Sequence, residues 1–140
     1  MTDTIALYKY AEDHGIDVDW FTVPINKSMS LKLPDGTCSI ALDPWKMPTL
    51  ADENVSLAHE LGHCETGSFY SPSSKYELVE RSENRADKWA IKKLIPKDEL
   101  EEEVLHGDSE VWSLAEHFGV TEQFMQKAMQ YYIDGNMGVE

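Results

Sequence analysis

The segment His59-Glu60-Leu61-Gly62-His63 is the point from which the rest of this chain can be interpreted. It has the pattern H-E-x-x-H. Residues four apart on an α-helix lie about 40° from each other around the axis, so the imidazoles of His59 and His63 point the same way. Two histidines at this spacing can bind one zinc ion, and Glu60 between them can act as a general base. The segment therefore predicts a helix that carries a metal site on one face.

The residues around this segment favour that helix. Thr49 followed by Asp52 resembles a capping box, which marks a helix start. The apolar residues then recur at helical spacing, at Ala51, Val55, Ala58 and Gly62. Gly62 costs a helix about 1 kcal/mol relative to alanine, and its presence indicates close packing of another backbone. Gly67 predicts that the helix ends near residues 64–65.

A catalytic zinc site needs a third protein ligand, and a second helix offers one. This helix is predicted to start at a capping box, Ser74 to Glu77, and to stop before Pro96. Its apolar stripe consists of Tyr76, Val79, Ala86, Ala90 and Leu94. Glu83 lies within that stripe, where a carboxylate is costly unless it is paired or binds a metal. Glu83 is therefore favoured as the third ligand over Glu80, which lies further towards the polar face.

Other residues are candidates for supporting roles. Asp87 lies one turn after Glu83 on the same side, and it can accept a hydrogen bond from the ring of a ligand histidine. Tyr70, Tyr76 and His106 are candidate donors to the oxyanion of a transition state. Ring packing is the more ordinary role for the two tyrosines. His106 is expected to end a helix.

These motifs together resemble those of a known family. The segment H-E-L-G-H, with Glu83 further along on a helix that also holds Asp87, is similar in layout to the gluzincin site of thermolysin. More closely, the pattern E-x-x-A-D-x-W-A at residues 83–90, followed by L-I-P at 94–96, resembles the ImmA/IrrE family of metallopeptidases. The resemblance covers about residues 48–96.

The resemblance implies a function. In that family the residues matching His59, His63 and Glu83 bind one zinc ion, and the residue matching Glu60 is catalytic. Members are typical of bacteria, phages and mobile elements, and several cleave a repressor that is often encoded next door. The chain is thus expected to be a zinc endopeptidase whose protein substrate is a transcriptional repressor of a phage or mobile element.

Two other functions compete with this one. The first is a non-catalytic regulatory protein that contains zinc and binds a partner protein. Glu60 argues against it, because purely structural zinc sites favour closed, cysteine-rich ligand sets. The second is a DNA-binding domain, since Ala115, Gly119 and Val120 have the spacing of a helix-turn-helix. However, residues 122–132 hold one lysine and no arginine, which suits DNA poorly. The C-terminal pair is therefore expected to close the core or to dock the substrate.

Composition limits the partners. The formal charge of −14 repels nucleic acid and anionic membranes. It favours a basic partner, although solubility alone explains it equally well. The sequence shows neither an apolar run of membrane length nor a basic-then-apolar start, so membrane insertion and export are not expected. Its two cysteines, Cys38 and Cys64, do not make a disulfide framework, so the protein is expected to be cytoplasmic. Cys64 follows His63 and should point about 100° away from it, so it is expected to be a buried thiol and not a metal ligand.

The pattern along the chain predicts an α+β fold. Helices are expected at 3–14, after Pro96, at 109–119 and at 121–133, a strand at 18–25, and a hairpin around the turn 34–37. The expected arrangement is one domain, 1–140, with an N-terminal helix and hairpin in 1–50, two zinc-site helices in 51–96 and a helical part in 97–140. A small antiparallel sheet would pack on the zinc-site helices. It would either be the floor of the core or receive an extended substrate as an added strand. Trp45 is expected in the core.

Overall fold

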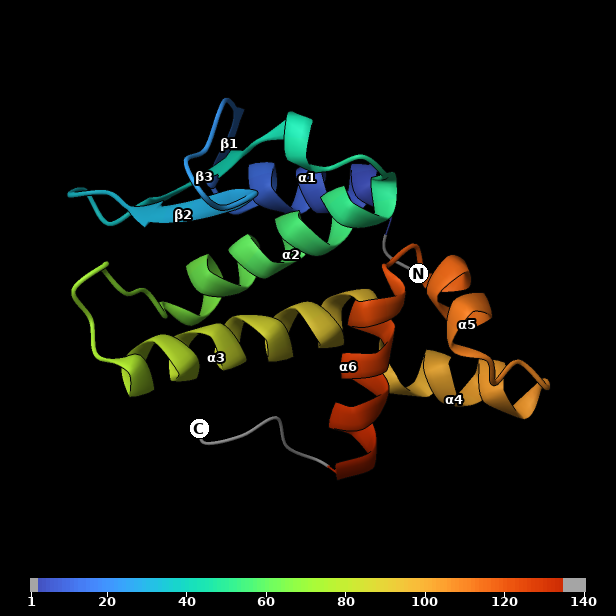
Figure 1. The fold of residues 1–140 in the computed structure, drawn as a ribbon. Coiled ribbons are helices and arrows are strands. Elements are labelled where there is room, and N and C mark those ends of the chain that lie inside the picture. Colours follow the sequence, from blue (N-terminus) through green and yellow to red (C-terminus); the bar gives the residue numbers. More distant parts are fainter. Residues whose placement is uncertain (1–2, 135–140) are drawn as a thin grey trace.

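Helix α2 (Leu50–Thr66) lies between a small sheet and helix α3 (Tyr76–Leu94) (Figure 1). The computed structural model describes residues 3–134, and it confirms the α+β class. The other elements are α1 (Thr4–Asp13), β1 (Asp17–Trp20), β2 (Ser28–Lys32), β3 (Cys38–Leu42), the 3-10 turn η1 (Pro44–Lys46), α4 (Lys97–Leu105), α5 (Val111–Phe118) and α6 (Glu122–Asp134). Because α2 contacts both the sheet and α3, the segment with the two histidines is central in the fold.

The sheet has the strand order β1-β3-β2. Strands β2 and β3 pair antiparallel, with Ser30 opposite Ile40, so the hairpin is confirmed. Strand β1 pairs with β3 in parallel, with Val18 opposite Ile40, so the sheet is mixed and not wholly antiparallel as expected. The reason is the connection 21–27, which carries the chain past β3 to its other side before β2 begins. Strand β2 is thereby left at an edge of the sheet.

Helix α2 begins and ends with the signals in its sequence. The hydroxyl of Thr49 accepts a hydrogen bond from the amide of Asp52, 3.1 Å away, as the capping box predicts. Gly67 terminates the helix in a left-handed conformation with φ 65°, and its amide donates to the carbonyl of His63. The helix is thus slightly longer than predicted, because Gly67 and not the residues before it stops it.

Helix α3 begins later than the capping box predicts. Its N-cap is Lys75, which makes no side-chain cap. The hydroxyl of Ser74 instead accepts a hydrogen bond from the amide of Ser71, 2.9 Å away, and closes a turn before the helix. The predicted Ser74–Glu77 capping box is therefore wrong. Tyr76, predicted on the apolar stripe, is 76% exposed, because the first turn of α3 extends beyond the core.

Helices α2 and α3 approach each other closely at Gly62. A Cβ atom built on Gly62 would lie 2.5 Å from the backbone oxygen of Ala86 on α3, which is closer than such atoms can come. The expected close packing of another backbone against this glycine is therefore confirmed. It brings the histidine-bearing face of α2 against the face of α3 that holds Glu83.

The two cysteines form a disulfide between Cys38, the first residue of β3, and Cys64 on α2. The prediction of a free buried thiol at Cys64 is therefore wrong. Packing of the sheet on α2 brings the two residues together, with their Cα atoms 5.8 Å apart, although they are distant in sequence. The bond ties the sheet to the part of α2 that holds His63.

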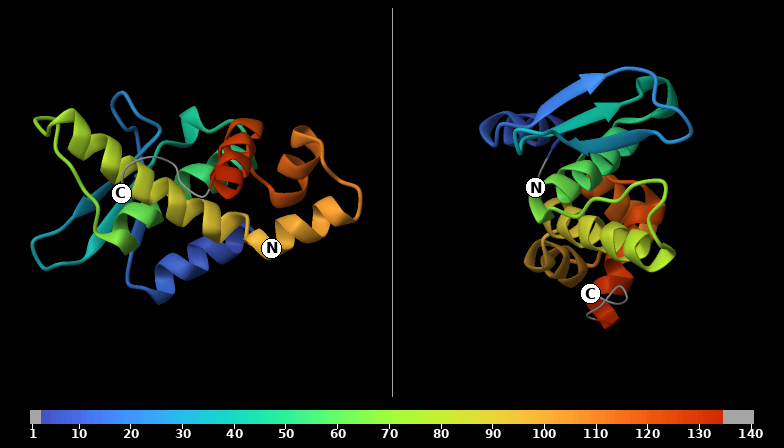
Figure 2. Two further views of the ribbon diagram at one scale, coloured as in Figure 1. Left: turned by 90° about the horizontal axis from the view of Figure 1, so that it is seen from below. Right: turned by 90° about the vertical axis from the view of Figure 1, so that its left-hand side faces the viewer.

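The C-terminal helices α4, α5 and α6 lie together at the end of the α2–α3 pair where α2 begins and α3 ends (Figure 2). Buried Asn54 on α2 links the N-terminal helix to this part: it accepts a hydrogen bond from the hydroxyl of Thr4 (2.6 Å) and donates one to the carbonyl of Gly119 (2.9 Å).

Trp45 is 91% exposed, so its predicted place in the core is wrong. Within residues 3–134 no helix combines the length and apolar character that crossing a membrane requires.

Candidate metal centre

Three side chains from two helices converge on one point. His59 and His63 come from α2 and Glu83 from α3, and the ligand atoms they offer all lie within 4.8 Å of one another. The Nε2 atoms of the two histidines are 3.2 Å apart. The Glu83 carboxylate lies 2.8 Å from Nε2 of His59 and 3.2 Å from Nε2 of His63. The structure thus brings together the three residues that the sequence places on facing sides of two helices.

The opposite nitrogen of each ring is held by an acceptor. Nδ1 of His59 lies 2.7 Å from Oδ1 of Asp87, and Nδ1 of His63 lies 2.6 Å from the carbonyl oxygen of Ser68. Each Nδ1 must therefore carry a hydrogen and donate it, which leaves Nε2 as the basic nitrogen of the neutral ring. Both Nε2 lone pairs then face the same point as the Glu83 carboxylate.

Three acceptors around one point repel one another unless a cation lies between them. In the metal-free protein a proton takes this place. Burial lowers the pKa of His59, but its hydrogen bonds to Asp87 and Glu83 outweigh burial and raise the pKa to about 10. Burial raises the pKa of Glu83, but the hydrogen bond from protonated His59 and the close contact with His63 outweigh burial and hold this pKa well below its usual range. A protonated His59 then donates to Glu83.

The donor set fits a metal ion better than a proton. Two imidazole nitrogens and one carboxylate are a ligand set that zinc takes in hydrolytic sites with an open fourth position. A proton bonds only His59 to Glu83, whereas a divalent cation can be bound by all three groups at once. Glu80, the competing third ligand, is exposed and interacts with Tyr76. The geometry therefore favours Glu83 as the third ligand.

Glu60 is buried beside this cluster. It is 6% exposed, and its Oε2 accepts a hydrogen bond from the hydroxyl of Ser28 on β2, 2.7 Å away. It lines the same cleft as His63 and Glu83. A carboxylate in this position can exchange a proton with a molecule in the cleft while Ser28 holds one of its oxygens.

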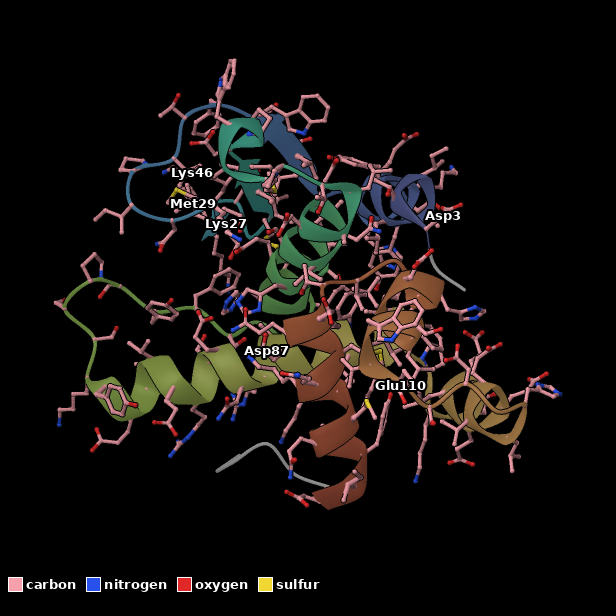
Figure 3. All side chains as sticks on the ribbon, turned by 45° about the vertical axis from the view of Figure 1, so that its right-hand side comes forward. Asp3, Lys27, Met29, Lys46, Asp87 and Glu110 are labelled. Carbon is pink, nitrogen blue, oxygen red and sulfur yellow. A yellow bond between two sulfur atoms is a disulfide. The ribbon has the colours of Figure 1, made fainter. Side chains whose placement is uncertain are left out.

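The cleft beside the cluster has a volume of about 410 Å³. One wall is the edge strand β2, with residues 28–31, and the other is the segment 69–72 between α2 and α3. Figure 3 labels Met29 on the first of these walls. The apolar side chains of the walls lie next to the polar cluster, a combination typical of ligand-binding clefts.

Only one of the three candidate oxyanion donors lies at the cluster. The hydroxyl of Tyr70 donates to Oε1 of Glu83 over 2.6 Å. Burial and this hydrogen bond raise the pKa of Tyr70, so the phenol keeps its proton. Tyr76 is exposed and hydrogen-bonded to Glu80, away from the cleft. His106 follows α4, which leaves from the end of α3 remote from Glu83, so the structure does not bring it to the site (Figure 1).

Sequence reasoning missed three contributors. Ser68 acts through its backbone carbonyl, which no residue pattern reveals. Ser28 and Lys127 reach Glu60 and Asp87 from distant parts of the chain, from β2 and from α6. The one usable signal was the alternation of residues in β2, which predicts that alternate side chains of that strand face α2.

Comparison with known proteins agrees with the geometry. A family model described as an IrrE N-terminal-like domain, Peptidase_M78, matches residues 11–130. No curated protein matches the chain. A solved structure titled Mycobacterium tuberculosis transcriptional regulator is similar, with a TM-score of 0.66 and 16% identity. The similarity covers 91% of this chain and 40% of that one, so this chain spans less than half of that protein, and at this identity it shows a shared fold. Since the family model covers most of the chain, including both helices of the cluster, the predicted resemblance is confirmed and the chain belongs to the Peptidase_M78 family of IrrE N-terminal-like domains.

Proposed function

We propose that the protein is a zinc-dependent endopeptidase that hydrolyses a peptide bond in a protein substrate. Membership of a peptidase family supports a metallopeptidase-type function. The observation that carries the proposal is the convergence of His59, His63 and Glu83, with both Nδ1 atoms engaged elsewhere and both Nε2 atoms turned inwards. One zinc ion per chain would be bound by these three residues.

The chain's own groups would divide the chemistry between them. Bound zinc would polarise the scissile carbonyl and make water more acidic. Glu60 would take a proton from the attacking water and later give it to the leaving amine, because its carboxylate lies in the cleft beside the ligands. Ser28 would hold Glu60 in place. Tyr70 would turn its hydroxyl from Glu83 to the oxyanion as charge develops there.

The substrate would bind as an extended segment. Strand β2 is an edge strand and forms one wall of the cleft, so a peptide can add to it by backbone hydrogen bonds. Met29, Leu31 and Phe69 would receive its apolar side chains. Because several members of the family cleave a repressor, we further propose that this segment belongs to a transcriptional repressor of a phage or mobile element.

The test is a cleavage assay with wild type, Glu60→Gln and His63→Ala. Glu60→Gln should keep zinc but lose at least about a hundredfold in cleavage, since a positioned general base contributes 10²–10⁴-fold. His63→Ala should lose both zinc and cleavage. Glu53→Gln is the matched control, because Glu53 lies on the same helix but binds Tyr8 and not the site. Full activity of Glu60→Gln would refute the mechanism.

The substrate is tested by co-expression with a candidate repressor, chosen because its gene lies beside that of the protein. The repressor should be cut in the presence of the wild type and stay intact with Glu60→Gln. Binding of the repressor without any cut, by a protein that holds zinc, would favour the non-catalytic regulator. A hydroxamate separates the two roles, because it binds only where zinc has an exchangeable position.

A further inference from the structure

A lysine from the C-terminal helix reaches the metal centre indirectly. Nζ of Lys127 on α6 donates to Oδ2 of Asp87 over 2.9 Å, and the other oxygen of Asp87 is 2.7 Å from Nδ1 of His59. Figure 3 shows Asp87 on α3 beside α6. The Asp87 side chain is 12% exposed, so its carboxylate has little water to orient it. Its orientation is set by Lys127 on one oxygen and His59 on the other.

Lys127 pairs with one of several carboxylates at the site. Glu60, Glu83 and Asp87 contribute three carboxylates within one site. The ion pair of Lys127 reaches Asp87 directly. Lys27 lines a cavity beside His59, Glu60 and Glu83 but forms its ion pair with Asp52, and Lys9 and Lys46 pair with Asp13 and Asp43. A divalent cation and Lys127 together carry three positive charges, which balance the three carboxylates. Lys127 therefore belongs to the charge set of the site although it touches no ligand.

We propose that Lys127 is a positioning residue of the metal centre. It fixes the Asp87 carboxylate so that Oδ1 faces His59, and thereby holds the His59 ring with Nε2 towards Glu83. The inference rests on the proposed metal site. It also means that α6, which belongs to the C-terminal helices, helps to determine how strongly metal is bound at α2 and α3.

Two effects of Lys127 on metal affinity have opposite signs. As a positive charge near the site it repels a cation, so its removal by itself would strengthen metal binding. By holding Asp87, Lys127 also orients the ligand His59, so the removal of Lys127 would weaken metal binding. Groups that orient metal ligands are worth 10–100-fold in affinity, and the proposal requires this second effect to be the larger. The direction of the change therefore decides between them.

The experiment is zinc affinity, measured by competition with a chelator, for purified wild type and three variants. Lys127→Met should bind zinc about tenfold more weakly, at the lower end of the range for orienting groups. Lys127→Arg should stay within about threefold of wild type, because it keeps the charge and the donors. Lys9→Met is the matched control: it removes a Lys–Asp pair of similar length, 2.8 Å to Asp13, remote from the site, and should change nothing.

Two further readouts separate positioning from general stability. In an Asp87→Ala background, Lys127→Met should cause no additional weakening, because the group through which Lys127 acts is gone. The absorption spectrum of bound Co²⁺ should shift in Lys127→Met and return in Lys127→Arg. Unchanged or tighter zinc binding by Lys127→Met would overturn the proposal and leave the metal site standing. Absence of zinc from every protein, wild type included, would overturn both.

Discussion

Gly62 on α2 faces the backbone of Ala86 on α3 so closely that a side chain at residue 62 has no room, with only 2.5 Å between a built Cβ and the Ala86 oxygen. Gly62→Ala gains about 1 kcal/mol of helix propensity but must push the two helices apart, and overpacking costs about 1–3 kcal/mol. We expect a lower free energy of unfolding in urea and weaker zinc binding, because His63 and Glu83 separate. A variant as stable as wild type, with unchanged zinc affinity, would contradict this packing.

Ser28 tests the role of the edge strand. Its hydroxyl contacts Glu60 and none of the three ligands, so Ser28→Ala should leave zinc affinity unchanged. Cleavage should fall about ten- to a hundredfold in kcat, since a hydrogen bond to a charged group contributes about 1.5–3 kcal/mol. Ser39→Ala on the neighbouring strand β3 is the control, since Ser39 does not line the cleft. If Ser28→Ala lost zinc affinity by the same factor as cleavage, the contact between Ser28 and Glu60 would be structural.

Proton release should accompany zinc binding. The pKa of His59 is raised to about 10 in the metal-free protein, so at pH 7 the ring holds an extra proton that zinc must displace. The apparent affinity for zinc should therefore rise with pH, about tenfold per unit, and level off above pH 10. Calorimetry in buffers of different ionisation enthalpy measures the protons released. Zinc binding without proton release at pH 7 would contradict the bridging of His59 to Glu83.

Asn54 links three parts of the fold and offers a test of stability apart from the site. Asn54→Ala leaves the Gly119 carbonyl without its donor and removes the acceptor of Thr4. We expect a loss of about 2 kcal/mol in the free energy of unfolding. Thr4→Val removes only one of the two bonds and should cost less. Equal costs would mean that the bond to Gly119 contributes nothing.

Features of the fold and site that depend on residues close together in sequence could be predicted. His59 and His63 are four residues apart, so helix geometry alone places their side chains on one face, and Glu60 lies between them in sequence. Glu83 stood out as a carboxylate on an apolar stripe. Gly62 signalled close packing by its cost to a helix, and the hairpin followed from alternation of apolar residues.

The rest depends on contacts between segments that are distant in sequence. The pairing of Cys38 with Cys64 follows from how the sheet lies on α2, and no spacing rule indicates it. The direction of β1 depends on the path of the connection 21–27. Lys127 is an ordinary lysine until α6 is placed against α3, where it meets Asp87. The exposure of Trp45 likewise depends on where η1 sits on the surface.

The most direct test of the account is the metal content of purified protein, with wild type beside Glu83→Ala and Glu80→Ala. Glu80 is the matched control, since it is a glutamate one turn earlier on the same helix and is exposed. Wild type and Glu80→Ala should each hold about one zinc per chain, and Glu83→Ala should hold much less. A wild type that takes up no zinc even after reloading, or a Glu83→Ala variant that retains it fully, would contradict the proposed metal centre.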